Sequence, residues 1–263
     1  MTNKQTNKQT NKQTNKQTNK QINVNEAHHV SPKARFSIHK VILDWFSTQK
    51  LGKVLDAPAG YGHLSMKLKE MGYDVTCGEI NPAIFKIPDL KCIYTDLNRE
   101  IQAESNSFDY VCCVDGLEHM TDPYQAVKEF SRVLKPGGIG VFSIPNYSNV
   151  EKRFKFLIHG YLTKPTQFDA YLNANEQLFD FHNSPLTITQ LDFIFKINHL
   201  QIVDIKRNAK KAKQNLLMPF VYLLKLFNKF NSEKSKKKHK TEVTLDNRVI
   251  LGGNNLIFII RKV

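Results

Sequence analysis

At 263 residues, 41% of them hydrophobic, the chain is long enough to bury a core in one domain with additions or in two small ones. The net charge of +14 is concentrated in residues 1–25, with five lysines and no acid, and in residues 206–240, with twelve basic residues and one acid. Because the rest of the chain is close to neutral, the charge argues against a nucleic-acid-binding core and favours basic appendages that meet an anionic surface.

Targeting features and cysteine usage favour a cytoplasmic protein. The N-terminus is polar and lacks the apolar segment of a signal peptide, and no apolar run reaches the roughly 18 residues expected of a membrane-spanning helix. The four cysteines lie in predicted strands, without the spacing of a disulfide framework or a zinc site. We therefore expect reduced thiols and a cytoplasmic location, with peripheral attachment to the inner face of the membrane left open.

The first segment of the chain is a simple repeat. Residues 2–21 are five copies of Thr-Asn-Lys-Gln, which provide no apolar stripe to bury, so residues 1–25 are expected to form a disordered tail. Residues 26–263 are then expected to form one domain, with a cap insertion at 146–185 and a basic amphipathic insertion at 207–247.

From residue 35 onward, helical and extended patterns alternate. Helices are predicted at 35–49, 62–71, 122–134 and 187–198, with a short helix or turn at 81–82 and a helix stop at 135–138. Strands are predicted at 53–56, 74–79, 91–95, 108–114, 140–144, 200–206 and 255–261. Strands that are apolar on both faces and alternate with helices indicate an α/β fold, in which a parallel sheet is covered on both sides.

The two insertions differ in composition. Residues 146–185 are aromatic and polar, and we expect an irregular segment that caps a pocket. In the second insertion, Leu216–Phe230 is apolar nearly all round and is flanked by lysines at 210–213 and 234–240. Such a helix is too short to span a bilayer, but it can lie in a membrane interface, pack over the sheet as core, or form a dimer interface. The sequence predicts no particular oligomeric state.

The segment Val54–Gly62 has the pattern of a strand, a tight loop and the start of a helix. Its glycines, Gly60 and Gly62, have no Cβ, so the loop can let a nucleotide-like ligand approach the backbone. Acids also end successive strands, at Asp56, Glu79, Asp96 and Asp115. Ligands of open α/β sheets bind at these carboxyl ends, so the four acids are candidate ligand contacts.

Several motifs occur in the order found in one enzyme family: VLDAPAGYG, CGEIN, YTDLN, and FDYVCCVDGLEHMTDP running into LKPGGIGVFSIPN. On these motifs the chain resembles the class I S-adenosylmethionine-dependent methyltransferases, in the group that modifies small molecules and cell-envelope precursors. The resemblance is close over Val54–Asn146 and looser elsewhere. It implies a Rossmann-like, seven-stranded, mostly parallel sheet with an antiparallel last strand, and S-adenosylmethionine as cofactor. One departure is Pro58, which replaces the first glycine of the usual loop and removes a backbone donor.

The resemblance implies that residues after the first strand hold the amino-acid end of the cofactor. Ala59, Gly60 and Gly62 would lie against that end. Asp56 would order the loop or the cofactor's ammonium, through hydrogen bonds or water. The alternative for Asp56 is a solvated strand-end residue without a ligand.

The nucleoside and the sulfonium are implied to meet the later strand ends. Glu79 would accept hydrogen bonds from both ribose hydroxyls, and Asp96 would accept the adenine amino group, with Leu97 beside the ring. Asp115 and Gly116 would line the pocket near the sulfonium. Each acid could instead be a solvated residue, but their shared position at the strand ends favours binding.

Methyl transfer is an in-line displacement, so positioning supplies much of the rate, and an oxygen nucleophile also needs a general base. His119 is the candidate base because histidine titrates near neutrality, with a structural role as the alternative. Asp115, Glu118 and His119 also resemble the acidic-x-x-Glu-His set that binds a divalent metal in some O-methyltransferases, with His182 as a further nitrogen. Such mixed ligands suit Mn²⁺ or Zn²⁺ better than Mg²⁺, and a metal-free pocket wall is the alternative.

Three functions follow from these features. The first is an S-adenosylmethionine-dependent methyltransferase at the cytoplasmic membrane face, with a small-molecule, lipid-linked, glycan-precursor or quinone-like acceptor. The second is a soluble methyltransferase of RNA or another polymer, whose basic tails would make binding strongly salt-dependent. The third is a non-catalytic cofactor-binding partner protein.

Overall fold

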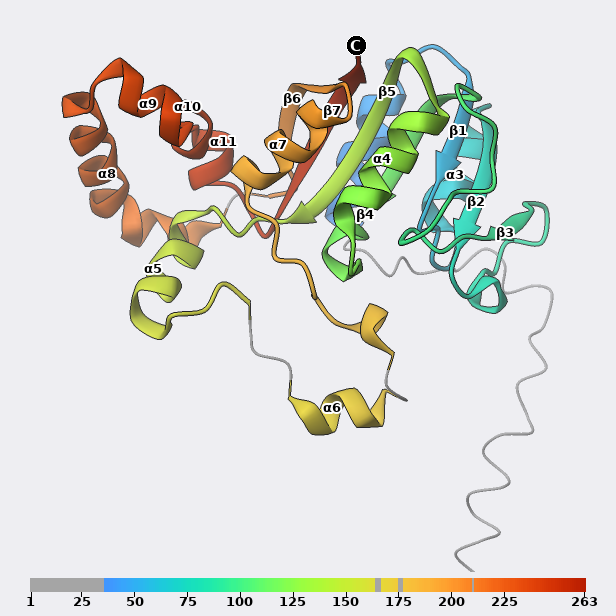
Figure 1. The fold of residues 1–263 in the computed structure, drawn as a ribbon, viewed down its shortest axis with the longest axis horizontal. Coiled ribbons are helices and arrows are strands. Elements are labelled where there is room, and N and C mark those ends of the chain that lie inside the picture. The colour runs from blue at the N-terminus through green and yellow to red at the C-terminus, as the bar shows by residue number, and fades with distance from the viewer. Residues whose placement is uncertain (1–35, 164–166, 175–176, 210) are drawn as a thin grey trace, which may run out of the picture. The chain divides into compact units, whose positions relative to one another are not determined.

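The computed structural model describes residues 36–163, 167–174, 177–209 and 211–263. The predicted tail at residues 1–25 lies outside them, as does the start of the first predicted helix. Figure 1 shows the ribbon of the described domain, in which helices flank a central sheet. The elements of this sheet decide where the functional site forms.

The domain is built on one seven-stranded sheet in the order β3-β2-β1-β4-β5-β7-β6. Its strands are β1 Lys53–Asp56, β2 Asp74–Glu79, β3 Cys92–Tyr94, β4 Phe108–Val114, β5 Leu134–Pro145, β6 Leu200–Arg207 and β7 Asn255–Lys262. β7 is antiparallel to both of its neighbours, and the pairs among β1 to β5 are parallel. The expected α/β fold, mostly parallel with an antiparallel last strand, is confirmed.

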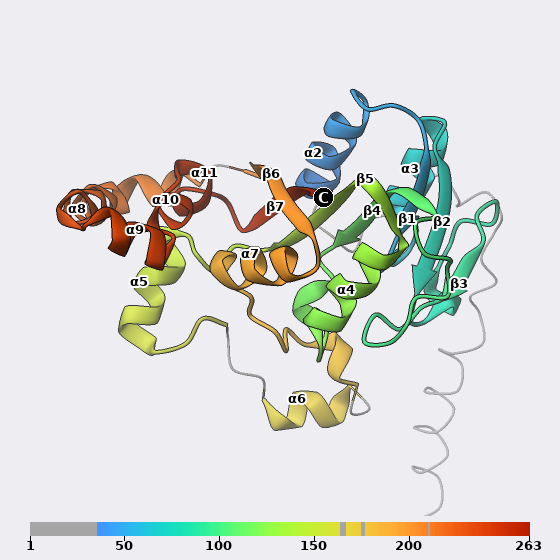
Figure 2. The same ribbon diagram turned by 45° about the horizontal axis from the view of Figure 1, so that its top comes forward.

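Two cores cover the two faces of the sheet, because successive residues of a strand point to opposite sides. The helices that cover it are α2 Phe36–Phe46, α3 His63–Glu70, α4 Pro123–Val133 and α7 Ile188–Ile197. α2 and α3 pack on the face that carries Val54, and α4 and α7 pack on the face that carries Leu55. Figure 2 shows the two helix layers with the sheet between them. Burial of both faces explains why the strands are apolar on both sides.

The start of β5 differs from the sequence-based expectation. The sequence predicts that residues 135–138 separate a helix from a strand, but β5 begins at Leu134, immediately after α4. Leu134 pairs with Phe108 ahead of a register shift, so the motif lies within an irregular strand start. Gly137 has φ 75°, a left-handed conformation that suits a residue without a Cβ. A bulged strand start therefore replaces the predicted break.

The expectation of an irregular segment at 146–185 is wrong in its first half, where α5 (Val150–His159) forms. The Asn149 side chain caps this helix by accepting a backbone N–H at its first turn. Two short helices follow, α6 Phe168–Asn173 and η4 Leu178–Asp180. Only the first residue of α5, Val150, is buried. Its apolar residues nevertheless recur at the spacing of a helix, at Val150, Phe154, Leu157 and Ile158, and this signal indicates the helix.

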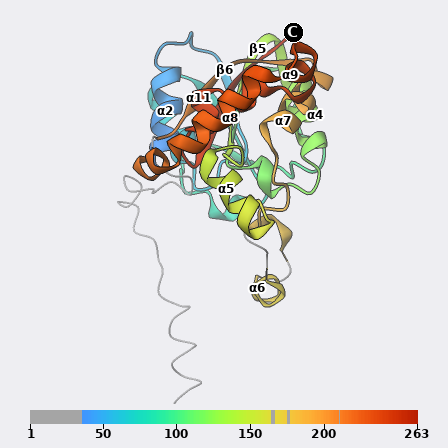
Figure 3. The ribbon, with the colours of Figure 1, turned by 90° about the vertical axis from the view of Figure 1, so that its left-hand side faces the viewer.

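The second insertion forms a layer of helices beside α5. Its elements are η5 Ala212–Leu217, α8 Met218–Phe230, α9 Glu233–His239, α10 Thr241–Thr244 and α11 Asn247–Ile250. Val221 of α8 is buried in one cluster with Val150 of α5 and Ile250 of α11. Figure 3 shows α5 and α8 on the same side of the domain. Among the described residues, no helix has the length and apolar character needed to cross a bilayer.

The aromatic packing on the Leu55 face predicts a large loss when one ring is removed. Phe142 is fully buried on β5, with its ring centroid 5.3 Å from those of Phe130 and Phe195. We expect Phe142→Ala to lower the free energy of unfolding by about 3–5 kcal/mol, because the rigid sheet cannot fill the cavity. Phe193→Ala on α7, where the ring is 52% exposed, should cost less than about 0.5 kcal/mol. Equal losses for the two variants in urea unfolding would contradict this packing.

Candidate functional site

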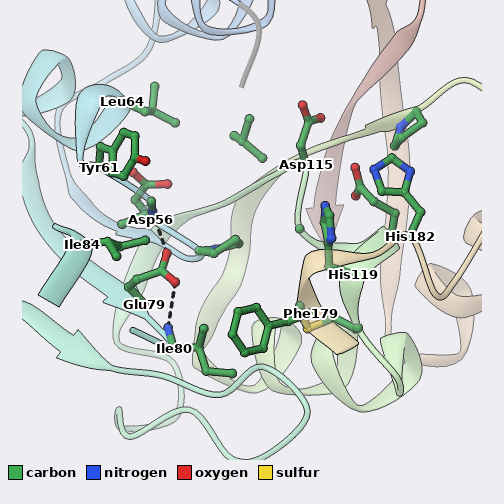
Figure 4. A pocket seen from close by; sticks show the side chains of 18 of the residues that line it. Asp56, Tyr61, Leu64, Glu79, Ile80, Ile84, Asp115, His119, Phe179 and His182 are labelled. Carbon is green, nitrogen blue, oxygen red and sulfur yellow. Dashed lines mark hydrogen bonds between the residues drawn. The ribbon is translucent and has the colours of Figure 1, made fainter. Parts of the chain in front are cut away.

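A cavity of about 780 Å³ opens at the carboxyl ends of β1, β2 and β4. Asp56 ends β1, Glu79 ends β2 and Asp115 follows β4, so the sheet itself brings these three acids to one place. Figure 4 shows Asp56 and Glu79 on one wall, with His119 and His182 on the opposite wall. This is the edge at which parallel α/β sheets bind ligands.

The loop between β1 and α3 forms the first wall and is held against β2. The Ala59 N–H donates to the Gly78 carbonyl at 2.8 Å, and the Gly60 N–H donates to Glu79 Oε2 at 2.8 Å. Gly60 has φ 55°, which favours glycine at this point of the turn. Ala59 and Gly60 both line the cavity, so a ligand there can contact backbone.

Two further glycines allow close approach of neighbouring segments. Gly62 begins α3 at φ 88°, and a Cβ there would lie 2.6 Å from the Phe85 ring. Gly116 lies just beyond β4, and a Cβ there would lie 2.5 Å from Pro58 of the loop. Gly116 lines the cavity, whereas Gly62 is not among its lining residues. Pro58, which replaces the usual first glycine, therefore packs against the segment that follows β4.

The Glu79 side chain accepts three backbone hydrogen bonds, the longest of them from the Asn81 N–H to Oε1 at 3.4 Å. Its Oε2 accepts the Gly60 N–H, and its Oε1 accepts the Ile80 N–H at 3.0 Å. Figure 4 shows this carboxylate at the cavity wall, where its side chain is only 5% exposed. The remaining lone pairs of its oxygens can accept hydrogen bonds from a ligand without any rearrangement.

Asp56 is buried beneath the loop and links β1 to α3. It is 1% exposed and accepts a hydrogen bond from Ser65 Oγ at 2.5 Å. Burial raises the pKa of Asp56 to about 7, opposed by the Ser65 hydrogen bond and reinforced by the charge of Glu79. The Ser65 hydrogen bond joins the end of β1 to α3, which follows the loop. The ordering of the loop by Asp56 and its contact with a ligand's ammonium stay predictions.

Asp115 is held by the neighbouring strands β5 and β7. It has φ 49°, and its Oδ1 accepts hydrogen bonds from Ser143 Oγ and, at 2.9 Å, from Asn255 Nδ2. These partners fix the carboxylate where the cavity passes from the loop wall to the opposite wall. Ser143 lies within the motif LKPGGIGVFSIPN, which does not specify its partner, and Asn255 comes from β7, far along the chain.

Asp96 and Leu97 are not among the residues that line the cavity. Asp96 follows β3, accepts the Asn98 N–H at 3.0 Å, and has a carboxylate oxygen 3.3 Å from Arg99 Nε. Leu97 is buried in the core on the Leu55 face of the sheet. The adenine contacts expected of Asp96 and Leu97 therefore stay a prediction.

The opposite wall is formed by η3 (Leu117–His119) and the segment after η4. Glu118, His119 and His182 each offer one atom that can bind a metal ion, a carboxylate oxygen or a ring nitrogen, and these atoms lie within 4.8 Å of one another. Glu118 is 2% exposed, and its Oε2 has no hydrogen-bond partner in the part of the chain that the structure describes. Burial raises the pKa of Glu118 well above its usual value. His182 Nδ1 forms a hydrogen bond with Tyr147 OH at 3.0 Å.

This three-residue cluster is a place where a divalent ion fits. Two imidazoles and one carboxylate suit Zn²⁺ or Mn²⁺ better than Mg²⁺, which prefers oxygen ligands. A buried carboxylate oxygen without a described partner favours either a cation or a proton beside it. Three of the four candidate ligands from the sequence come together here, whereas Asp115 is hydrogen-bonded to Ser143 and Asn255.

Several lining residues were not singled out from the sequence, and four of them matter most for the chemistry of the cavity. They are His39 of α2, His63 of α3, Lys152 of α5 and Phe179 of η4. His39 lies on the buried side of its helix, where the apolar pattern indicates core. The position of His39 on that apolar side is the signal in the sequence that marks it as unusual, but it identifies neither a partner residue nor a cavity.

The raised pKa of Asp56 makes stability depend on pH in a defined direction. The unfolded chain loses this proton near the ordinary value of 3.8, and the folded chain loses it near 7. The contribution of Asp56 to stability therefore falls as the pH rises between these values. We expect Asp56→Asn to remove this fall. In urea unfolding, the free energy of unfolding of the variant should therefore increase relative to that of the wild type as the pH rises from about 4.5 to about 8.

The matched control is Asp74→Asn, because Asp74 is exposed at the start of β2. Its stability relative to the wild type should not change over the same pH range. A difference between Asp56→Asn and the wild type that is independent of pH would contradict a raised pKa at Asp56.

The loop, the strand ends and η3 that form much of this cavity lie in a region that is similar to known proteins. Residues 55–142 match the family model described as a methyltransferase domain. A ubiquinone biosynthesis O-methyltransferase from Xanthomonas oryzae pv. oryzae is 30% identical over 118 residues, which cover 40% of this chain and 49% of that protein. A protein of the same name from Pseudomonas fluorescens is 33% identical over 117 residues, which cover 41% of this chain and 50% of that protein. The chain thus spans about half the length of these curated relatives.

Solved structures share the fold at low sequence identity. A SAM-dependent methyltransferase from Archaeoglobus fulgidus has a TM-score of 0.53 at 16% identity, covering 86% of this chain and 93% of that one. Phosphoethanolamine N-methyltransferase 2 from Haemonchus contortus, solved in complex with S-adenosyl-L-methionine, has a TM-score of 0.51 at 18% sequence identity. The superposition covers 86% of this chain and 52% of that one. The match to the methyltransferase family model runs from β1 to β5, over about a third of the chain, and the described domain has the fold of these solved methyltransferases.

Proposed function

We propose that this protein transfers the methyl group of S-adenosylmethionine to a small-molecule acceptor bound beside His119 and His182. The observation that carries the proposal is a single cavity with two unlike walls. The loop wall consists of Ala59, Gly60 and Glu79, and the imidazole wall consists of Glu118, His119 and His182. Relatives named for ubiquinone O-methylation support an acceptor with an oxygen nucleophile.

The loop wall fits the proposed cofactor. The fixed Glu79 carboxylate suits a pair of ribose hydroxyls, and the open backbone at Gly60 suits the amino-acid end. A volume of about 780 Å³ lies in the range of sites that hold small ligands and cofactors. When bound, the cofactor supplies a methyl group that its sulfonium charge has already activated.

At the imidazole wall, the chain has to orient the acceptor and remove its proton. Burial lowers the pKa of His182, which keeps that ring neutral near pH 7. The ring of His119 meets the ring of His182 edge to face, with centroids 4.8 Å apart. A hydroxyl held between the walls can give its proton to His119 while the carbon–oxygen bond forms and the carbon–sulfur bond breaks. Alignment of the acceptor supplies much of the remaining rate.

A divalent ion is a second possible occupant of the imidazole wall. Glu118, His119 and His182 would hold it, and its charge would lower the pKa of a bound hydroxyl. The two roles of the wall differ in one measurable respect, because only the metal-bound form makes transfer sensitive to chelators.

We also infer that the acceptor is reached at an anionic membrane surface. The apolar face of α8, directed away from Val221, exposes Tyr222, Leu223, Leu226, Phe227 and Phe230. Lys229 lies among these side chains, and the exposed Lys234, Lys237 and Lys238 follow on α9. Apolar side chains beside exposed cations are complementary to an anionic bilayer surface.

α5 links this face to the cavity. Its Leu157 and Ile158 are exposed, its Val150 packs in the same cluster as Val221, and its Lys152 lines the cavity. A lipophilic acceptor held at the membrane would therefore meet the helix that borders the site. The other side of α8 packs as core, which accounts for part of its apolar character.

Label transfer from methyl-labelled S-adenosylmethionine to fractionated cell extract tests the proposed reaction. We expect label in a small-molecule or lipid fraction. His119→Gln should slow transfer by about 100-fold if His119 is the base, with little change in S-adenosylhomocysteine affinity. Glu79→Gln should weaken that affinity by about tenfold, because a charged acceptor of ribose hydrogen bonds is lost.

Glu70→Gln, at an exposed site on α3, is the control and should behave as the wild type. Transfer that survives exhaustive chelation would exclude a required metal at the imidazole wall. Label in RNA would favour the polymer reaction instead, and cofactor binding without label in any fraction would favour a non-catalytic role.

Vesicle binding tests the membrane inference. The triple variant Leu223→Ser, Phe227→Ser and Phe230→Ser should bind phosphatidylglycerol vesicles at least tenfold more weakly, as about 1.5–3 kcal/mol per large apolar side chain is lost. The matched triple variant Leu51→Ser, Phe193→Ser and Ile197→Ser changes exposed apolar residues elsewhere and should bind as the wild type. Undiminished vesicle binding by the first variant would end the inference, and a change from dimer to monomer would assign the face to self-association.

A further inference from the structure

A histidine pair borders the cavity next to the loop wall. His39 of α2 and His63 of α3 both line it, with their Nδ1 atoms 2.9 Å apart and their stacked ring centroids 5.0 Å apart. The Phe36 ring meets the His63 ring edge-on, with centroids 6.2 Å apart. Because α3 starts at His63, directly after the glycine loop, the pair lies where the amino-acid end of the cofactor is expected.

The short distance between the two Nδ1 atoms defines what each ring can offer to a ligand. One Nδ1 must carry a hydrogen and the other a lone pair, so two neutral rings present one Nε2–H donor and one bare Nε2. Burial lowers the pKa of His39 to about 4, and burial also lowers the pKa of His63. The pair is therefore neutral near pH 7. An anion placed against it would favour a protonated ring and turn both Nε2 atoms into donors.

We propose that His39 and His63 form the subsite for the carboxylate of the cofactor's amino-acid end, and that the pair takes up one proton when this carboxylate binds. The inference rests on the proposed function, which supplies the ligand. The charged side chains that line the cavity beside the loop are those of Asp56 and Glu79, which suit an ammonium or hydroxyls and repel a carboxylate. Lys86 lies over the Tyr61 ring, with its Nζ 4.6 Å from the ring centroid, and is not among the lining residues.

The lysine that lines the cavity belongs to the other wall. Lys152 comes from α5, and its Nζ lies 5.9 Å from the ring centroid of Tyr147, whose hydroxyl is hydrogen-bonded to His182. Among the described lining residues, the histidine pair therefore provides the groups beside the loop that can become cationic. The pair is therefore suited to bind the carboxylate, a part of the cofactor that neither Glu79 nor the imidazole wall would hold.

Other titratable groups near the pair also act on a bound carboxylate. On α3, Lys67 lowers and Glu70 raises the pKa of His63, while Lys40 on α2 is paired with Asp44 at 3.0 Å. Asp56 of β1 and Asp115 after β4 line the same cavity. Because protonation of Asp56, whose pKa burial raises to about 7, also weakens the repulsion of a carboxylate as the pH falls, the comparison of the two ligands has to be repeated in variants of the histidine pair.

The test measures binding of S-adenosylhomocysteine and of its decarboxylated analogue, which keeps the amine, the ribose and the adenine. Calorimetric titrations run from about pH 6 to about pH 8.5, in buffers of different ionisation enthalpy. The preference for the carboxylated ligand should rise by about tenfold as the pH falls. Its binding should also take up about one more proton than binding of the analogue.

His39→Gln and His63→Gln keep a polar side chain of similar reach that cannot take up the proton. Each variant should reduce the preference for the carboxylated ligand by roughly tenfold at about pH 6, and should leave only the weaker pH dependence that Asp56 contributes. Affinity for the decarboxylated analogue should change little. His239→Gln, at an exposed position on α9, is the matched control and should leave both affinities unchanged.

The outcomes separate this inference from the proposed function. An unchanged preference and pH dependence in both variants, with S-adenosylhomocysteine still bound, would overturn the subsite alone. Equal loss of both ligands would also overturn it, because the pair would then only support the fold. Failure of the folded wild-type protein to bind either ligand would overturn the proposed function together with the subsite.

Discussion

The hydrogen bonds from the Gly60 and Ile80 backbone to the Glu79 carboxylate tie the loop after β1 to the end of β2. They depend on the parallel pairing of these strands, in which Asp56 lies beside Cys77, two residues before Glu79. Asp56 extends the same link into α3 through Ser65. A register slip of one residue would turn these side chains to the opposite face, so the whole cavity depends on strand register.

Much of the fold could be predicted because one physical signal dominates each segment. The strands expected at 74–79 and 108–114 agree with the structure residue for residue, since turn-forming residues bound runs that are buried on both faces. Acids at the ends of parallel strands were expected to share one edge, and Asp56, Glu79 and Asp115 do so. The structure does not place Asp96 in the same cavity, because its local hydrogen bonds with Asn98 hold it at the end of β3.

What the sequence did not reveal depends on contacts between distant segments. The packing of α5 against α8 joins residues about seventy positions apart, whereas α5 itself has a local signal in the helical spacing of its apolar residues. The pairing of His39 with His63 likewise requires α2 to pack against α3, which no local pattern specifies. These same contacts unite the cap and the basic insertion, so that one helix, α5, borders the cavity with Lys152 and the apolar face with Leu157.

The placement of the buried acids fits a reaction that moves positive charge across the cavity. In the proposed reaction, the charge on sulfur near the loop wall disappears as a proton reaches the imidazole wall. Asp56 lies under the first wall and Glu118 in the second, and burial raises the pKa of both. A nearby cation favours the ionised form of either acid. Asp56 can therefore stabilise the sulfonium at the loop wall before transfer, and Glu118 can stabilise the protonated imidazole afterwards. The neutral product loses its attraction to the loop wall, and this loss favours its release once transfer is complete.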